Sequence, residues 1–319
     1  MASSAWNSLV HRSLEAWGSL NKDHPTLPAN ILRSFASLED FLSGSSGSLM
    51  FWFFQRREAF LLQKSMTKWS SKNLEDYIIL PASTGFVTRT ECFFVSHFWQ
   101  TNDDPDPDGK YLRLIQENLQ PQTWSYVWVD WSCIPQYPRT QNEETYFLRG
   151  IQTMSGIIRN SGFVWFYPPF RPRLWILYEV AEYVLTIDDS ADTISYMGAS
   201  EDSSMFSEHI REMLEQGVRP TLEKYGYICS YERDKEFLTS WLEVLVLLRK
   251  LCLDIDDIRA SLDYLTWFPR TKKMYRPTTK GLMEMSRYEG TLVINGDCYQ
   301  FSPFQNWVSI CYNEYFTLC

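Results

Sequence analysis

The sequence lacks the features that mark several large classes of protein. Its 319 residues hold no apolar run near the roughly 20 residues that a membrane span requires, and no signal-peptide pattern. The seven cysteines form no Cys-x-x-Cys pair and no zinc-binding cluster, so we expect reduced thiols, no metal and a cytoplasmic location. Neither GxGxxG nor a Walker-type GxxxxGK[ST] loop occurs, which excludes a glycine-rich phosphate cradle.

Positive charge is also scarce. The chain has 30 Lys and Arg against 39 Asp and Glu, a net charge of -9, so a nucleic-acid site must be a local patch and DNA is not an expected partner. The segment RTKKMYRPTTK at 270–280 has five cations and no acid: Arg270, Lys272, Lys273, Arg276 and Lys280. It predicts either an RNA- or phosphate-binding patch or a solvated basic loop.

Hydrophobic and aromatic residues, by contrast, are abundant. They make up 45% and 16% of the chain, and 22% of the residues are charged. This balance is typical of a globular chain with one large or two modest domains. The many rings predict a rigid core and aromatic walls around a pocket or a partner surface.

The apolar periodicity divides the chain into three parts. In 1–89, apolar residues at three- and four-residue steps predict a helical N-terminal extension, with helices over 29–42 and 51–69. From 90 to 200, short apolar strands alternate with helical segments. This pattern predicts an α/β core with a parallel sheet that helices cover on both faces.

Residues 201–319 are expected to form a mainly helical C-terminal extension. Helices are predicted over 204–216 and 234–253, and Asn295-Gly296 between two alternating segments predicts a β-hairpin. With no internal repeat and no low-complexity tract, both extensions are expected to pack on the core as one body.

Ligands of such sheets bind at the carboxyl ends of the strands. The sequence places Ser96, His97 and Trp99 after one strand, and Asp130, Trp131 and Cys133 after the next. Ser96 is a candidate nucleophile or ligand hydroxyl. It is not expected to pair with His97, because neighbouring residues of a strand point to opposite faces. Asp130 either holds a ribose or an ammonium group, or caps its own loop.

Several motifs together resemble the TIR-like superfamily, particularly its fungal heterokaryon-incompatibility branch. They are FFVSHFW, DPDPDGKYLRLI, VWVDWSCIPQ, a TM-x-x-II run and RLWILYEVAEY, and they span about 92–197. The resemblance implies a flavodoxin-like sheet. In enzymatic members it implies cleavage of NAD at the nicotinamide glycosidic bond, with no tightly bound cofactor.

The same resemblance implies a catalytic glutamate on the helix after the third strand. Glu179 matches the Trp-Cys-x-x-Glu pattern from Trp175 onward, except that Ile176 replaces the cysteine. A carboxylate beside an anomeric carbon stabilises an oxocarbenium-like transition state or acts as nucleophile. The other reading of Glu179 is a solvated or paired helix residue. Arg171 and Trp175 are the expected substrate contacts near it.

Two further interpretations stay open at this stage. Tyr178 and Glu182 are four residues apart on one predicted helix, and this spacing resembles the Tyr and Glu pair of tRNA-dependent cyclodipeptide synthases. In that case Ser96 would accept an aminoacyl group from aminoacyl-tRNA. Alternatively, the chain is a non-catalytic TIR-like signalling module that acts as a homo-oligomer.

Overall fold

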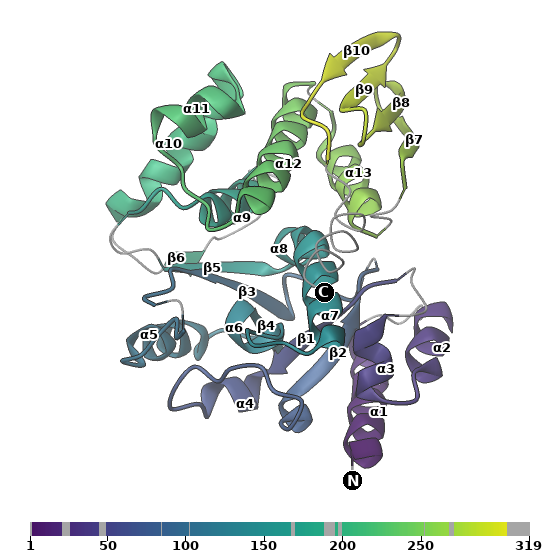
Figure 1. Cartoon of the computed structure of the whole chain (residues 1–319), viewed down its shortest axis with the longest axis vertical. Coiled ribbons are helices and arrows are strands. Elements are labelled where there is room, and N and C mark those ends of the chain that lie inside the picture. Colours follow the sequence, from purple (N-terminus) through teal and green to yellow (C-terminus); the bar gives the residue numbers. More distant parts are fainter. Residues whose placement is uncertain are drawn as a thin grey trace, which may run out of the picture. The chain divides into compact units, whose positions relative to one another are not determined.

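The computed structural model of the chain describes residues 2–20, 26–44, 49–83, 85–101, 103–166, 170–187, 195–196, 200–251, 253–267 and 271–304. The chain forms two units. One comprises Met1–Pro169, Asp192–Asp202 and Thr266–Pro269, and the other comprises Phe170–Ala191, Ser203–Leu265 and Arg270–Cys319. Sheets and helices occur in both, as predicted for an α/β chain (Figure 1). Within the described residues, no helix is both long and apolar enough to span a bilayer.

A six-stranded sheet is the centre of the first unit, in the order β2-β1-β4-β3-β5-β6. β4, β3, β5 and β6 run parallel, whereas β1 is antiparallel to β2 and β4. The sheet is therefore mixed, and the prediction of a parallel sheet was correct for only part of it. The strands are β1 (Phe51–Arg56), β2 (Tyr77–Pro81), β3 (Cys92–His97), β4 (Tyr126–Val129), β5 (Gly162–Phe166) and β6 (Ser195–Tyr196).

The N-terminal segment contributes strands as well as helices. The predicted helix over 51–69 was wrong for 51–56, which form β1, and a helix occupies only α4 (Arg57–Leu61). The physical reason is the run Phe51 to Phe54, whose four side chains are all buried. A strand covered on both faces buries consecutive large side chains, whereas a surface helix needs a polar face. The remaining N-terminal helices are α1 (Ala2–Leu20), α2 (Thr26–Ser34), α3 (Leu38–Ser43) and the short 3-10 helix η1 (Leu74–Asp76).

A tyrosine completes the hydrogen bonding at the start of β1. β1 pairs with β4 only at Gln55 and Arg56, so Phe51 and Phe53 have no strand partner on that side. The hydroxyl of Tyr146 accepts the N–H of Phe53 at 3.2 Å and donates to the carbonyl of Phe51 at 3.0 Å. Tyr146 lies on α7 (Gln141–Thr153), and α8 (Ser155–Asn160) follows that helix.

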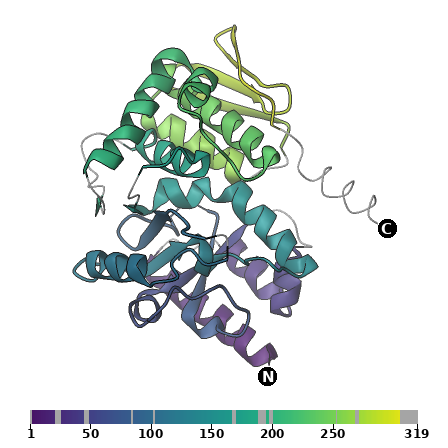
Figure 2. The same ribbon diagram turned by 60° about the vertical axis from the view of Figure 1, so that its left-hand side comes forward.

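Helices flank both faces of this sheet (Figure 2). The helix α5 (Lys110–Leu119) buries Leu112, Ile115 and Leu119 in a core with Val95 and Val129. On the opposite face, the ring of Phe94 stacks on those of Trp128 and Phe163. These alternating apolar faces fix the register of β3, because a slip by one residue would exchange them.

The second unit combines helices with a small antiparallel sheet in the order β10-β9-β8-β7. The predicted hairpin is one turn of that sheet, and Asn295 and Gly296 both take positive φ there. The predicted helices 204–216 and 234–253 correspond to α10 and α12. The elements are α9 (Leu174–Val184), α10 (Ser200–Gln216), α11 (Val218–Lys224), α12 (Glu232–Lys250), α13 (Ile255–Trp267), β7 (Lys273–Thr278), β8 (Gly281–Ser286), β9 (Thr291–Ile294) and β10 (Asp297–Gln300).

Candidate functional site

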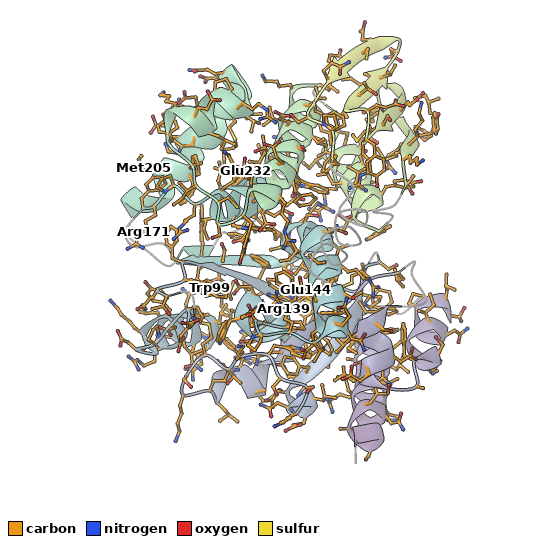
Figure 3. All side chains as sticks on the ribbon, viewed as in Figure 1. Trp99, Arg139, Glu144, Arg171, Met205 and Glu232 are labelled. Atoms are coloured by element: carbon orange, nitrogen blue, oxygen red, sulfur yellow. The ribbon has the colours of Figure 1, made fainter. Side chains whose placement is uncertain are left out.

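A polar cluster lies at the carboxyl ends of the neighbouring parallel strands β3 and β4. The pairing of Val95 with Val129 brings the end of β3 level with the short helix α6 (Asp130–Cys133) that follows β4. His97 ends β3, and Trp99 follows it (Figure 3). Both side chains reach Asp130, so the structure brings three of the predicted site residues into contact.

The carboxylate of Asp130 accepts three hydrogen bonds. Its Oδ1 accepts His97 Nε2–H at 3.1 Å and the Trp131 backbone N–H at 2.6 Å, and its Oδ2 accepts Trp99 Nε1–H at 2.8 Å. A carboxylate oxygen accepts about two such bonds, so Oδ2 keeps one lone pair for a further donor. The side chain of Asp130 is 33% exposed, so it is partly open to solvent.

The ring of His97 donates to Asp130 through its Nε2–H, because a carboxylate oxygen is only an acceptor. The His97 side chain is 1% exposed, and its Nδ1 has no hydrogen-bond partner among the described residues. His97 therefore orients the carboxylate of Asp130.

The indole of Trp99, which contacts Asp130, packs against that of Trp131, and a lysine lies near the Trp131 ring. The rings of Trp99 and Trp131 are perpendicular, with their centroids 5.2 Å apart. Trp131 Nε1–H donates to the carbonyl of Met66, and Lys68 Nζ lies 5.2 Å from the Trp131 ring centroid. The loop after α4 is therefore fixed against α6. Lys68 was not predicted, because nothing in the sequence links it to residues more than sixty positions away.

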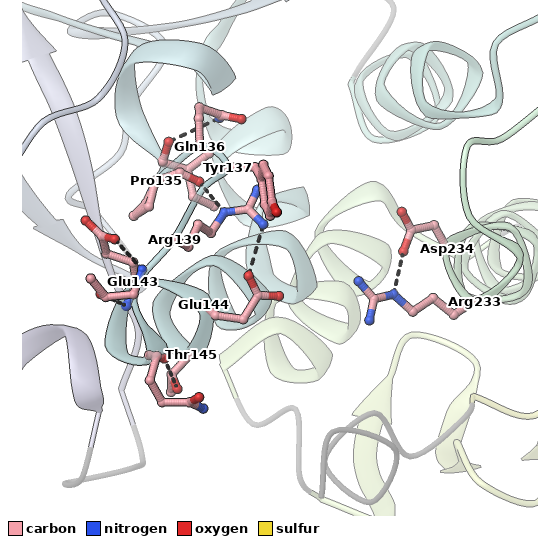
Figure 4. A network of polar contacts seen from close by, with 12 residues as sticks. Pro135, Gln136, Tyr137, Arg139, Glu143, Glu144, Thr145, Arg233 and Asp234 are labelled. Atoms are coloured by element: carbon pink, nitrogen blue, oxygen red, sulfur yellow. Dashed lines mark hydrogen bonds and ion pairs between the residues drawn. The ribbon is translucent and has the colours of Figure 1, made fainter. Parts of the chain in front are cut away.

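The segment that leaves α6 is also fixed in place. Gln136 Nε2–H donates to the backbone carbonyl of Asp130 at 2.9 Å. Further along, Arg139 Nε–H donates to the carbonyl of Pro135 at 2.7 Å, and its guanidinium pairs with Glu144 at 3.0 Å (Figure 4). The Asp130 backbone is thus held by the pairing of Val129 before it and by Gln136 after it, which keeps its carboxylate in one position.

Ser96 on β3 and Cys133 on α6 are buried. Ser96 is 1% exposed and, by strand alternation, points to the opposite face of the sheet from His97. Cys133 is also 1% exposed, and burial raises the pKa of its thiol to about 12. The structure therefore places both side chains in the core.

The other predicted residues belong to the second unit. Tyr178, Glu179 and Glu182 lie on α9 and are all buried, with Glu179 at 9% exposure. Glu182 accepts the indole N–H of Trp241 on α12 at 2.6 Å, so its carboxylate links two helices. The ring of Trp175 packs edge-on against Tyr178, and Arg171, just before the helix, is exposed (Figure 3).

The basic segment lies mainly on β7. Arg270 is outside the described residues. Lys272, Lys273 and Lys280 are exposed, and Arg276 is half-buried. Lys273 pairs with Glu284 at 3.0 Å, so an acidic residue outside the segment neutralises one of its five cations.

An acidic residue in the loop 103–108 has a structural role that we did not predict from the sequence. Asp106 is 2% exposed, and its two carboxylate oxygens accept the backbone N–H groups of Tyr111 and Leu112 at 3.0 and 2.8 Å. It therefore caps the first turn of α5. In the described part of the chain, no group of three or more His, Cys, Asp or Glu side chains is arranged to hold a metal.

No protein-family model, no curated protein and no solved structure matches the chain.

A second polar cluster lies in the second unit around His209 of α10. His209 Nδ1 shares a hydrogen bond with the hydroxyl of Tyr227 at 2.8 Å, and its ring stacks on Tyr225 with centroids 3.5 Å apart. The Tyr225 hydroxyl donates to Glu212, which also pairs with Lys224 at 2.8 Å. Burial lowers the pKa of His209; Glu208 and Glu212 oppose this shift, and Lys224 adds to it.

This lowered pKa predicts that acid destabilises the second unit. The fold holds His209 neutral, so its contribution to stability is complete above the unfolded-state pKa of about 6.5 and is lost as the pH falls below it. Urea unfolding of the wild type and of His209→Asn at pH 8 and pH 5 measures this. We expect the wild type to lose more stability on acidification than the variant, and equal losses would contradict the prediction.

Proposed function

We propose that the chain is an enzyme that cleaves NAD, or transfers a group from it or a related nucleotide, and that Asp130 binds a ribose hydroxyl at the strand ends of the first unit. The observation that carries the proposal is the fixed carboxylate, which three N–H donors orient and whose side chain is 33% exposed. Carboxylates at strand ends serve nucleotide sites in this way, because a ribose hydroxyl donates to them.

The surroundings of Asp130 also suit a nucleotide. The half-buried ring of Trp99 offers a face for a nicotinamide or adenine base. The order β4-β3-β5 makes the chain cross from one side of β3 to the other, and ligands of open α/β sheets bind at such a reversal. The resemblance to TIR-like enzymes supplies the reaction. It also assigns the catalytic carboxylate to Glu179, and that assignment rests on the resemblance alone.

The test is incubation of the purified protein with NAD, followed by chromatography and mass spectrometry of the products. The wild type should release nicotinamide. Asp130→Asn should raise KM about 10- to 100-fold, because its amide nitrogen cannot accept the N–H groups that the carboxylate now accepts. Asp108→Asn, an exposed substitution in the same unit, is the control and should leave KM unchanged.

Two results would count against this function. Intact NAD and intact NADP after incubation with folded wild-type protein would exclude cleavage and favour a binding module. Release of nicotinamide with the same KM in the wild type and in Asp130→Asn would remove the ribose site from Asp130 but leave the reaction in place.

A further inference from the structure

A lysine without an acidic partner contacts the indole of the residue that follows Asp130. Lys68 is half-buried, and its ammonium nitrogen lies 5.2 Å from the centroid of the Trp131 ring. This nitrogen donates a hydrogen bond to the backbone carbonyl of Tyr137 at 2.7 Å, and it forms no ion pair with a carboxylate of the described residues. An ammonium group has three donors, so two N–H groups of Lys68 are not bonded to any described residue.

The backbone on both sides of Lys68 is bonded to the helix that carries Asp130. Before it, the carbonyl of Met66 accepts the indole N–H of Trp131 at 3.2 Å. After it, the backbone N–H of Trp69 donates to the carbonyl of Trp131 at 2.9 Å. Met66 and Trp69 are each 6% exposed, so burial also anchors the loop. The position of Lys68 is therefore tied to α6, and an ordered group of this kind loses little freedom when it binds a ligand.

Lys68 and Asp130 are charged groups of opposite sign in one connected cluster. Trp131 contacts the Lys68 ammonium and packs edge-on against Trp99, and the Trp99 indole donates to Asp130 Oδ2 at 2.8 Å. No lysine or arginine of the described residues pairs with Asp130. A ligand that satisfies both groups must carry a hydrogen-bond donor and an anionic oxygen in one molecule. A nucleotide carries both, as ribose hydroxyl groups and phosphate oxygens.

We propose that Lys68 binds a phosphate of the nucleotide whose ribose Asp130 holds under the proposed function, on which this role depends. A ribose hydroxyl donates to the carboxylate, and a phosphate oxygen of the same nucleotide accepts from the ammonium. Lysine binds phosphate as a point charge, and hydrogen bonds between charged groups are stronger than those between neutral groups. The site therefore selects a phosphorylated nucleotide over a nucleoside, because a nucleoside offers hydroxyl groups to Asp130 but no anion to Lys68.

The test is calorimetric titration of the full chain with carbocyclic NAD, in which a methylene group replaces the ring oxygen of the nicotinamide ribose and prevents cleavage. Adenosine and carbocyclic nicotinamide riboside are titrated in parallel, because they keep the hydroxyl groups but lack the phosphates. Lys68→Gln should weaken the binding of carbocyclic NAD at least about tenfold and leave the binding of both nucleosides unchanged. Added salt should weaken the binding of carbocyclic NAD more in the wild type than in this variant, because salt screens the ion pair.

Lys64→Gln is the matched control, because Lys64 is an exposed lysine and its loss changes the net charge by the same amount. It should bind carbocyclic NAD like the wild type. If Asp130→Asn weakens this binding but Lys68→Gln weakens it no more than Lys64→Gln, the ribose site stands and the phosphate role of Lys68 is wrong. That role is also wrong if Lys68→Gln weakens the nucleosides as much as carbocyclic NAD. If the wild type binds no carbocyclic NAD, the proposed function itself fails, and the role of Lys68 fails with it.

Discussion

Replacing Glu179 by glutamine should lower kcat for nicotinamide release by at least about a hundredfold. The amide has nearly the shape of the carboxylate but no negative charge, so it cannot stabilise an oxocarbenium-like transition state or act as nucleophile. The side chain is 9% exposed, and a carboxylate screened from water stabilises positive charge more strongly than one in solvent. The expected effect is on kcat, in contrast to the effect of Asp130→Asn on KM.

The helix itself offers the matched control. Glu182 lies one turn beyond Glu179 on α9, and its carboxylate accepts the indole N–H of Trp241. Glu182→Gln keeps an acceptor oxygen for that bond, so we expect a folded protein with an unchanged kcat. Thermal unfolding of both variants shows whether each one is folded. An unchanged kcat in Glu179→Gln would contradict the catalytic role of Glu179, and loss of kcat in a folded Glu182→Gln would assign that role to Glu182.

Local sequence patterns were sufficient to predict the two strands that lead to the Asp130 cluster. Short apolar segments ending in polar residues predicted β3 and β4, and the parallel pairing of those strands brings His97 and Asp130 together. The identity of the hydrogen-bond partners could not be predicted in the same way. The Trp99 indole reaches Asp130 across 31 positions, and such a bond depends on side-chain rotamers that no local pattern specifies.

For the N-terminal strand β1, the local sequence was not sufficient to predict the structure. The run Phe51 to Arg56 has no alternation of apolar and polar residues, and a short apolar run is compatible with a strand or with a buried helix. Its conformation is decided by partners distant in the sequence, β2 on one side and the hydroxyl of Tyr146 on the other. Because these partners lie up to 95 positions away, the local sequence could not distinguish the two structures.

The close packing between β3 and β5 predicts a large loss of stability for Gly162→Ala. Gly162 is paired with Phe93, and a Cβ at Gly162 would lie 2.6 Å and 2.9 Å from two carbons of the Phe93 ring. Phe93 is itself enclosed in the core under α5, so it cannot move away freely. Overpacking of this kind costs about 1–3 kcal/mol, which exceeds the gain of about 0.4–1 kcal/mol from the lower chain entropy of alanine.

A second substitution tests whether that contact is the cause. Phe93→Ala removes the ring carbons that the new methyl group would meet, and alone it should destabilise the unit because the core loses volume. In the double variant the methyl group occupies the space that the ring leaves, so its destabilisation should be smaller than the sum of the two single effects. Urea unfolding of the wild type and the three variants gives the coupling free energy, expected on the order of 1 kcal/mol. Additive effects would show that the contact with the Phe93 ring is not the cause of the loss.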